Sequence, residues 1–421
     1  MKSSELFDKR QSFFLEAPAA LKGAVTAGIL IGLGSFAWGL SSGQETRTWG
    51  AFLFNLFMFF SLGLAGMIIA TIQDVVSAQW GRPMRRIHEG FGSFVPLAAV
   101  LFTLYIGAVW FDIAGAQGVY RWIGNPHMLD HFWGKKTWLQ PVPMYLRNIA
   151  TLAILALIVG WQLKLSTKRD AAFLEANDDN YKNIALESNT KLAFWASPIL
   201  VIYGVALTFF AFDILMSLSP LWFSTLWGGW IFASAMHTMV ASTLVVMFIF
   251  KLCKLNPAQA LSRDNFHDVG KLMHGFTIFF AYLTYAHILT YWYGNMPEET
   301  EYFLHRFHEP WINILFIVPI IGFVVPLYTL VFKAAKWTPS ITIPLCTGII
   351  IAQWLVNMLV VMPEVIQDPH AATAFPVLEI GLFFGVLSLF VAQFMWFAKR
   401  NPMLPVGDPL FAKYLDEQGH H

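Results

Sequence analysis

This sequence of 421 residues is poor in charge and in cysteine, and each shortage restricts what the chain can be. Only 13% of its residues are Asp, Glu, Lys or Arg, whereas 57% are hydrophobic. Such a composition is typical of a chain embedded in a membrane. The two cysteines, Cys253 and Cys346, form no C-x-x-C or C-x-x-C-H motif. We therefore expect neither an iron–sulfur cluster nor covalently attached haem on this chain.

Long polar segments are also missing. The longest stretches between apolar runs are residues 113–145 and 167–190, and neither is large enough to form a soluble domain with its own catalytic core. The first apolar run is not followed by a small-residue cleavage site, so we do not expect a cleaved signal peptide. Any chemistry of this protein is thus expected within or beside the membrane.

Ten apolar stretches run through the chain, and the charged residues lie almost entirely between them. A helix needs about 20 apolar residues to cross a bilayer, and the backbone inside lipid must be paired, so we predict an all-α integral membrane protein. Residues 1–19 are expected as an amphipathic N-terminus, 20–397 as the transmembrane domain and 398–421 as a C-terminal tail. The predicted helices span residues 20–41, 50–73, 90–112, 146–166, 192–217, 222–250, 271–294, 311–332, 340–362 and 375–397.

The positions of the basic residues predict the orientation. One side, which carries both termini and the loops after even-numbered helices, has 21 Lys and Arg, and the other side has the remaining 6 of the 27. Because cytoplasmic loops are rich in Lys and Arg, we expect both termini in the cytoplasm. The six residues on the opposite side are Arg47, Arg121, Lys135, Lys136, Arg147 and Arg306.

A short internal repeat predicts how the helices are grouped. The third helix contains R-I-H-E-G-F-G-S-F from Arg86 to Phe94, and the seventh contains K-L-M-H-G-F-T-I-F from Lys271 to Phe279. The two segments lie four helices apart and begin on the same side of the membrane. This arrangement favours two four-helix bundles, helices 2–5 and 6–9, with helices 1 and 10 at their flank.

Ionisable residues inside membrane spans are costly and are therefore candidates for function. His237 lies near the middle of helix 6 and His287 in the outer half of helix 7, while Asp112, Asp213 and Glu364 lie near the outer ends of helices 3, 5 and 9. Three interpretations remain open. The histidines could hold one haem b, the group could form a partial proton path, or these side chains could simply pair with neighbours and stabilise the bundle. No metal site is predicted.

A resemblance to a known family appears in helices 5–7. The run F-F-A-F-D-I-L-M-S-L-S-P-L-W-F-S-T-L-W-G (Phe209 to Gly228) resembles the helix 5–6 hairpin of the F subunit of bacterial alternative complex III. Residues Asp268 to Thr300, ending in W-Y-G-N-M-P-E-E-T, and Phe375 to Phe390 are similar to the same subunit. The family hairpin often reads Ser-Leu-Asp-Pro-His-Trp, whereas this chain has Ser-Leu-Ser-Pro-Leu-Trp.

The resemblance implies a membrane subunit of a quinol:cytochrome c oxidoreductase, or one using another periplasmic acceptor, with a polysulfide-reductase-type fold of two four-helix bundles. It implies partners: a sister quinol-oxidising membrane subunit, an iron–sulfur subunit, multihaem and monohaem c-type cytochromes, a terminal oxidase, and phospholipid. Haem and iron–sulfur clusters are then expected on the partners, and no redox cofactor on this chain.

We predict a scaffolding subunit without catalytic residues of its own, in which Asp213, His237, His287, Glu364 and Asp112 line a partial proton path. Two alternatives stay open. The chain itself could bind and oxidise quinol, with Asp112 and Asp213 as contacts, or it could be a secondary transporter, because prolines interrupt several of its helices.

Overall fold

The computed structural model describes residues 13–130, 133–175, 180–366 and 376–418. Within these ranges every regular element is helical, and ten helices are long and apolar enough to cross a membrane. The predicted all-α membrane fold is therefore confirmed. Most of residues 1–19 lie outside the described residues, and Phe13, which is described, is fully buried.

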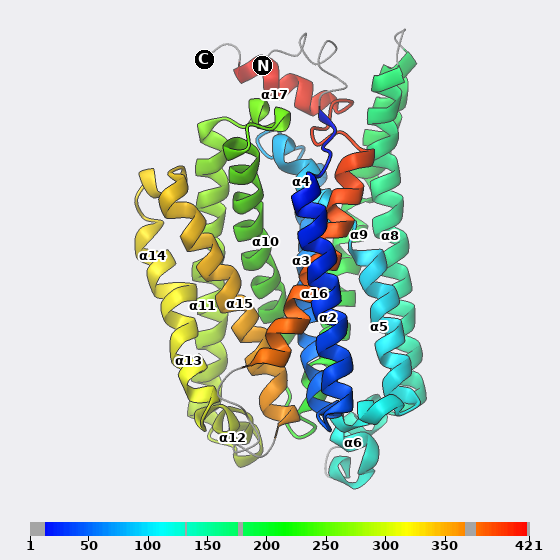
Figure 1. The fold of residues 1–421 in the computed structure, drawn as a ribbon, viewed down its shortest axis with the longest axis vertical. Coiled ribbons are helices and arrows are strands. Elements are labelled where there is room, and N and C mark those ends of the chain that lie inside the picture. The colour runs from blue at the N-terminus through cyan, green and yellow to red at the C-terminus, as the bar shows by residue number, and fades with distance from the viewer. Residues whose placement is uncertain (1–12, 131–132, 176–179, 367–375, 419–421) are drawn as a thin grey trace.

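The spans run nearly parallel to one long axis (Figure 1). They are α2 (Ala19–Ser41), α3 (Glu45–Val75), α4 (Arg85–Gly92) with α5 (Val95–Trp110), α8 (Pro141–Glu175), α9 (Asn180–Ile214), α10 (Trp227–Leu252), α11 (Arg263–Gly294), α13 (Trp311–Pro319) with α14 (Val325–Thr329), α15 (Pro339–Val365) and α16 (Val377–Arg400). The short helix α17 (Pro409–Gln418) marks what we call the terminal end. The short helices α6 (Arg121–Gly124) and α12 (Pro297–Leu304) mark the opposite, distal end.

Several helices differ from the spans that hydropathy predicts. The predicted polar loop 167–190 is largely helical, because α8 continues to Glu175 and α9 begins at Asn180. Helix α10 begins at Trp227, so residues 219–226 of the hairpin before it are not helical. The eighth span is interrupted by a π-helical turn, Ile320–Val324, which lies between Pro319 and Pro326. Proline removes a backbone donor, and such local turns accommodate the missing hydrogen bond.

The helices pack as two groups of four spans. One group contains α3, α4 with α5, α8 and α9, and the other contains α10, α11, α13 with α14, and α15. Helix α3 packs on both α10 and α15, and α10 also packs on α9, so these helices form the boundary between the groups. The most apolar part of α3 is 94% buried, which makes it the central helix of the molecule. This grouping agrees with the two bundles that the repeat predicts.

Helices α2 and α16 pack against one another through small residues. An added Cβ at Gly32 would lie 2.4 Å from the Cα of Gly385, and one at Gly28 would lie 2.0 Å from the Oγ of Ser388. Small residues allow two backbones to approach closely in lipid, where van der Waals contact drives helix association. This close contact holds the first helix against the rest of the protein.

A buried network of arginines and carboxylates lies at the terminal end, and we call it the arginine network. Its members are Arg82, Arg85, Arg86, Arg169, Asp74, Glu89, Asp170 and Asp408. All eight side chains are at most 7% exposed. Four positive and four negative charges balance only when Asp408, which comes from the C-terminal tail, is included. The network connects α3, α4, α8 and the tail.

The C-terminal tail is fixed to this network at Gly407 and Asp408. Asp408 accepts hydrogen bonds from Arg82 at 3.1 Å and lies 3.1 Å from a guanidinium nitrogen of Arg169, while the Gly407 amide donates to Asp170 at 2.9 Å. An added Cβ at Gly407 would meet the Arg169 carbonyl oxygen at 2.3 Å, so only glycine fits there. Beyond this point, α17 buries Phe411 and other apolar side chains in a small separate core that includes Phe13.

Replacing Gly385 with leucine should loosen α2 from α16, because the new side chain would occupy the space now filled by Gly32. We expect a loss of about 1–3 kcal/mol, as for other overpacked contacts. The measurement is the thermal unfolding midpoint in mild detergent. Gly34→Leu is the matched control, since an added Cβ at Gly34 meets no atom within 4 Å. Equal midpoints for the two variants would contradict the proposed packing.

Asp408→Asn should release the tail. Burial raises the pKa of Asp408, but the charges of Arg169, Arg82 and Arg85 outweigh burial and bring the pKa to about 2. The folded pKa is thus below the unfolded value near 3.9, so this carboxylate stabilises the docked tail above about pH 4 and ceases to do so as the pH falls towards 2. At neutral pH we expect tryptic cleavage after Lys413 to be roughly tenfold faster in the variant.

The control for this experiment is Asp416→Asn on the exposed face of α17, which should leave the cleavage rate unchanged. If Asp408→Asn and Asp416→Asn were cleaved at the same rate as the unmodified chain, the ion pairs of Asp408 would not be what holds the tail.

Candidate functional site

The distal end contains buried carboxylates that are each held by arginine. Asp213, in the last turn of α9, is fully buried and receives two hydrogen bonds from Arg147, to Oδ2 at 2.8 Å and to Oδ1 at 2.9 Å. Trp138 donates to the same carboxylate at 2.7 Å and Asn148 at 2.9 Å. Four donors therefore satisfy Asp213, and this geometry is that of a bidentate arginine–carboxylate ion pair.

Glu364, in the last turn of α15, is the second buried carboxylate, and its residue is 4% exposed. Arg306 donates to its Oε1 at 3.0 Å, and a guanidinium nitrogen of Arg121 lies 3.6 Å from its Oε2. Arg306 also donates to the backbone carbonyls of Leu359 and Val360. Pro363 has no N–H to offer the Leu359 carbonyl, so this arginine supplies the missing donor as well as neutralising the carboxylate of Glu364.

The other basic residues on the distal side also have partners, either carboxylates or backbone carbonyls. Arg47 forms an ion pair with Glu379 at 2.8 Å, and Lys136 forms one with Asp130 at 2.7 Å. Lys135 donates to the backbone carbonyls of Ser219, Pro220 and Trp222. With Arg121, Arg147 and Arg306, all six basic residues of this side are thus engaged. Burial lowers the pKa of Lys135 to about 8.

The hairpin 215–226 connects several of these groups, and we call it the distal hairpin. Ser217 donates to the backbone oxygen of Asp213, and Ser224 is hydrogen-bonded to Nε2 of His287 at 2.8 Å. The carbonyls that Lys135 binds belong to the same segment. Because residues 219–226 of the hairpin lack helical hydrogen bonds, these side chains supply partners to the backbone there and fix its shape.

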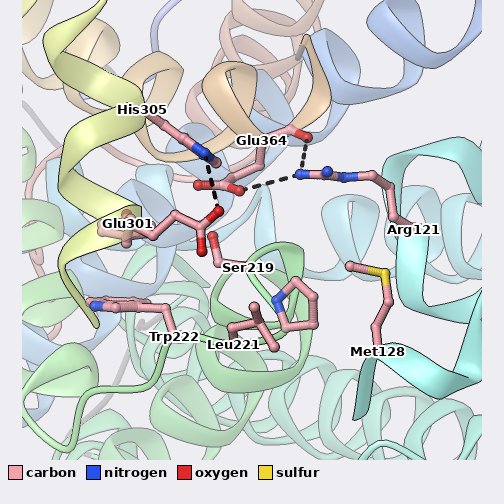
Figure 2. Close-up of a pocket in the computed structure, with 10 residues that line it drawn as sticks. Arg121, Met128, Ser219, Leu221, Trp222, Glu301, His305 and Glu364 are labelled. Carbon is pink, nitrogen blue, oxygen red and sulfur yellow. Dashed lines mark hydrogen bonds and ion pairs between the residues drawn. The ribbon is translucent and has the colours of Figure 1, made fainter. Parts of the chain in front are cut away.

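A small cavity opens between the distal hairpin and the end of α15 (Figure 2). Its volume is about 70 Å³, which is room for a few water molecules. Ser219 lies against it and is 7% exposed, yet its hydroxyl has no hydrogen-bond partner in the described part of the chain. Glu301 and His305, 3.6 Å apart, line the side that is open to solvent. The cavity therefore places Glu364 beside groups that can exchange protons with water.

Tyr302 lines this cavity and stacks on Trp222 with ring centroids 3.9 Å apart. Burial raises the pKa of Tyr302 to about 12, so its hydroxyl stays protonated at neutral pH. The stack joins α12 to the distal hairpin, and this contact brings α12 over the cavity.

His237 lies apart from these groups, in the interior of the second bundle. It is fully buried, and Gln353 of α15 donates to its Nδ1 at 3.0 Å. Its Nε2 is 3.0 Å from the hydroxyl of Thr277 on α11, and Ser234 donates to the other end of the Gln353 amide at 2.7 Å. Both ring nitrogens therefore have partners, and the chain of hydrogen bonds ties α10, α11 and α15 together.

The sequence-predicted residues thus separate into three places. Asp213 and His287 both contact the distal hairpin, and Glu364 shares a cavity with it. His237 is remote in the fold, at mid-length of α10. Asp112 is exposed at the end of α5, where it accepts a hydrogen bond from the Gln117 amide at 3.1 Å.

The arginines that pair with the buried carboxylates were not among the residues predicted from the sequence, which were carboxylates and histidines within the spans. Arg147 and Arg306 form ion pairs with Asp213 and Glu364. In the sequence, both arginines served only to predict the orientation of the chain in the membrane. Their position could have indicated a role, because basic residues are rare on this side of the membrane, and the few that occur there are expected to have a specific partner. Comparison with known proteins adds nothing to this assignment, since no family model and no curated protein matches the chain.

Arg147→Gln should destabilise the protein more than Asp213→Asn, because it leaves a buried carboxylate without its main counter-charge. We expect a loss of about 3 kcal/mol in unfolding free energy for Arg147→Gln. In the double variant Asp213→Asn with Arg147→Gln the penalty should be smaller than the sum of the two single effects, because no charge is left uncompensated. Unfolding midpoints of all four proteins in one detergent measure this coupling, and strictly additive losses would refute it.

Proposed function

We propose that this chain is a membrane subunit of a respiratory quinol-oxidising complex of the alternative complex III type, in a bacterial inner membrane with both termini cytoplasmic. In this role it holds the peripheral electron-transfer subunits and a sister quinol-oxidising subunit, and carries no redox group itself. The proposal starts from the resemblance of Phe209 to Gly228 and of Asp268 to Thr300 to the F subunit of that complex.

One structural observation supports the proposal most directly: the two resembling segments pack against each other. The hydrogen bond between Ser224 and His287 joins them at 2.8 Å, and the Tyr291 hydroxyl donates to the Phe223 carbonyl at 2.9 Å. The first segment ends at the start of α10 and the second runs along α11, so the resemblance covers one contiguous part of the fold. The contacts between the two segments lie at the distal end, which is the periplasmic side in the proposed orientation.

The ion pairs favour a structural role for the distal carboxylates over a role in quinol oxidation. Asp213 is enclosed by Arg147, Trp138 and Asn148, and these contacts order the outer loop relative to α9. A rigid distal surface is what a docking platform for periplasmic subunits requires. The cavity beside Glu364, with Glu301 and His305 at its mouth, supports the further suggestion that Glu364 belongs to a partial proton path opening on this side.

Purification of the tagged chain from bacterial membranes in mild detergent tests the proposed complex. We expect multihaem and monohaem c-type cytochromes, an iron–sulfur subunit and a second, related membrane subunit to co-purify and to be identified by mass spectrometry. Haem absorbance that follows the tag through size-exclusion chromatography is the quantitative readout. A chain that purifies alone or as a homo-oligomer without haem would overturn the proposal and favour a transporter.

The proton-path part of the proposal is tested separately in the purified complex. Glu364→Gln, which alters the carboxylate beside the cavity, should change the pH dependence of quinol oxidation while haem content stays constant, and so should Asp213→Asn and His237→Ala. Asp112→Asn, at an exposed position, is the control for an unspecific effect of a lost carboxylate. Full activity with an unchanged pH profile in all three test variants would leave Glu364, Asp213 and His237 with a purely structural role.

A further inference from the structure

The terminal end of the second bundle carries positive charge that the protein itself does not neutralise. Four cationic residues lie where the start of α11 meets the turn before α15, and only two carboxylates, Asp264 and Asp268, lie on the same stretch of α11. The four are Arg263, Lys271, Lys333 and Lys336, and we call them the basic cluster. Asp268 is already paired with Lys271 at 2.7 Å. An excess of two positive charges therefore remains.

Trp337 is the centre of this cluster. The guanidinium carbon of Arg263 lies 3.8 Å from the centre of the indole ring, the Lys333 nitrogen lies 5.7 Å from it, and the His267 ring lies 5.7 Å away on another side. Cations at these distances are held by the face of the ring, which fixes their positions relative to each other. The cluster is therefore an ordered group of donors and not a set of independent surface lysines.

Lys336 provides the second, independent observation. The residue is only 6% exposed, and its ammonium has no hydrogen bond or ion pair with any described residue. Its stem packs against α11 at Gly270, where an added Cβ would lie 2.7 Å from the Lys336 Cβ. Burial and the charge of Lys271 lower the pKa of Lys336. The stem of Lys336 is thus packed, while its ammonium is not enclosed and has no counter-charge among the described residues, so an anion from outside the chain can pair with it.

The surface next to the cluster is apolar and faces outward. Tyr328 and Phe332 are each 68% exposed, and Val331 is 64% exposed. They lie at the end of α14 that leads into Lys333 and Lys336. A ligand that satisfies both surfaces has an anionic head and hydrocarbon chains, which is the chemistry of an anionic phospholipid. A free phosphate would fit the cations but would leave the apolar side chains uncovered.

We propose that the basic cluster around Trp337 binds the phosphate headgroup of an anionic phospholipid, whose acyl chains lie along Tyr328, Val331 and Phe332. Lys336 and Arg263 contact the phosphate, and Trp337 sits at the level of the headgroups, where tryptophan is favoured. The site is separate from the distal end, and the proposal does not depend on the respiratory role.

The test measures how dioctanoyl-phosphatidylglycerol shifts the thermal unfolding midpoint of the purified, delipidated chain, or of its complex, compared with dioctanoyl-phosphatidylcholine. Ligand that binds the folded state raises the midpoint in a concentration-dependent manner. We expect the anionic lipid alone to do so at low concentration. In the double variant Arg263→Gln with Lys336→Gln its apparent affinity should fall roughly tenfold or more, since each basic residue near a membrane surface contributes about 1 kcal/mol.

The matched control is Lys22→Gln with Lys164→Gln, which removes two exposed charges from the same end of the bundle but on α2 and α8. It should bind the anionic lipid as the unmodified chain does. Because each variant is compared with itself in the two lipids, a general loss of stability cancels. Equal sensitivity of the test and control variants would overturn the proposal, and so would an equal shift by inorganic phosphate, which would mark a simple anion site.

Discussion

The structure depends on the pairing of arginine with carboxylates that are withdrawn from water. Removing charges from water costs several kcal/mol per ion, and the attraction repays that cost only when geometry and hydrogen bonding are complete. The chain meets this condition at both ends of the bundle. Asp213 receives four donors at the distal end, and Asp408 lies between Arg82 and Arg169 at the terminal end. Helix ends that carry polar groups are thereby fixed, while the helix centres are held by packing and by side-chain hydrogen bonds between helices, such as those of His237 in the second bundle and Gln162 in the first.

Hydropathy alone was sufficient for the spans because their length is imposed by the bilayer and not by the sequence of their neighbours. It failed where helices continue beyond the apolar region. Helix α8 extends to Glu175 and α9 starts at Asn180, although residues 167–190 read as a polar loop. A polar segment can still form helical hydrogen bonds, and hydropathy does not report on those. The late start of α10 has the opposite cause, because Pro220 and the surrounding serines favour a turn.

Single residues of the candidate site could be predicted from the sequence, but the residues that they pair with could not. Asp213 and Glu364 stood out because intramembrane carboxylates are rare, yet the sequence gives no register between α8 and α9 that would point from Asp213 to Arg147. Gln353 and Asn357 could be placed on one face of their helix from spacing, but that this face meets His237 depends on how α15 packs on α10. Partners across helices follow from tertiary packing, which a single sequence does not encode in any local pattern.

The internal repeat shows how one sequence pattern gives two environments. Arg86 and Glu89 of the first copy lie inside the arginine network, which the C-terminal tail completes by supplying Asp408. Lys271 and His274 of the second copy have no such cover among the described residues, and Lys336 beside them lacks a counter-charge. The two copies therefore differ because the counter-charge of the first, Asp408, comes from the tail and not from the repeat itself, whereas under our proposal the second takes its anion from the surrounding membrane.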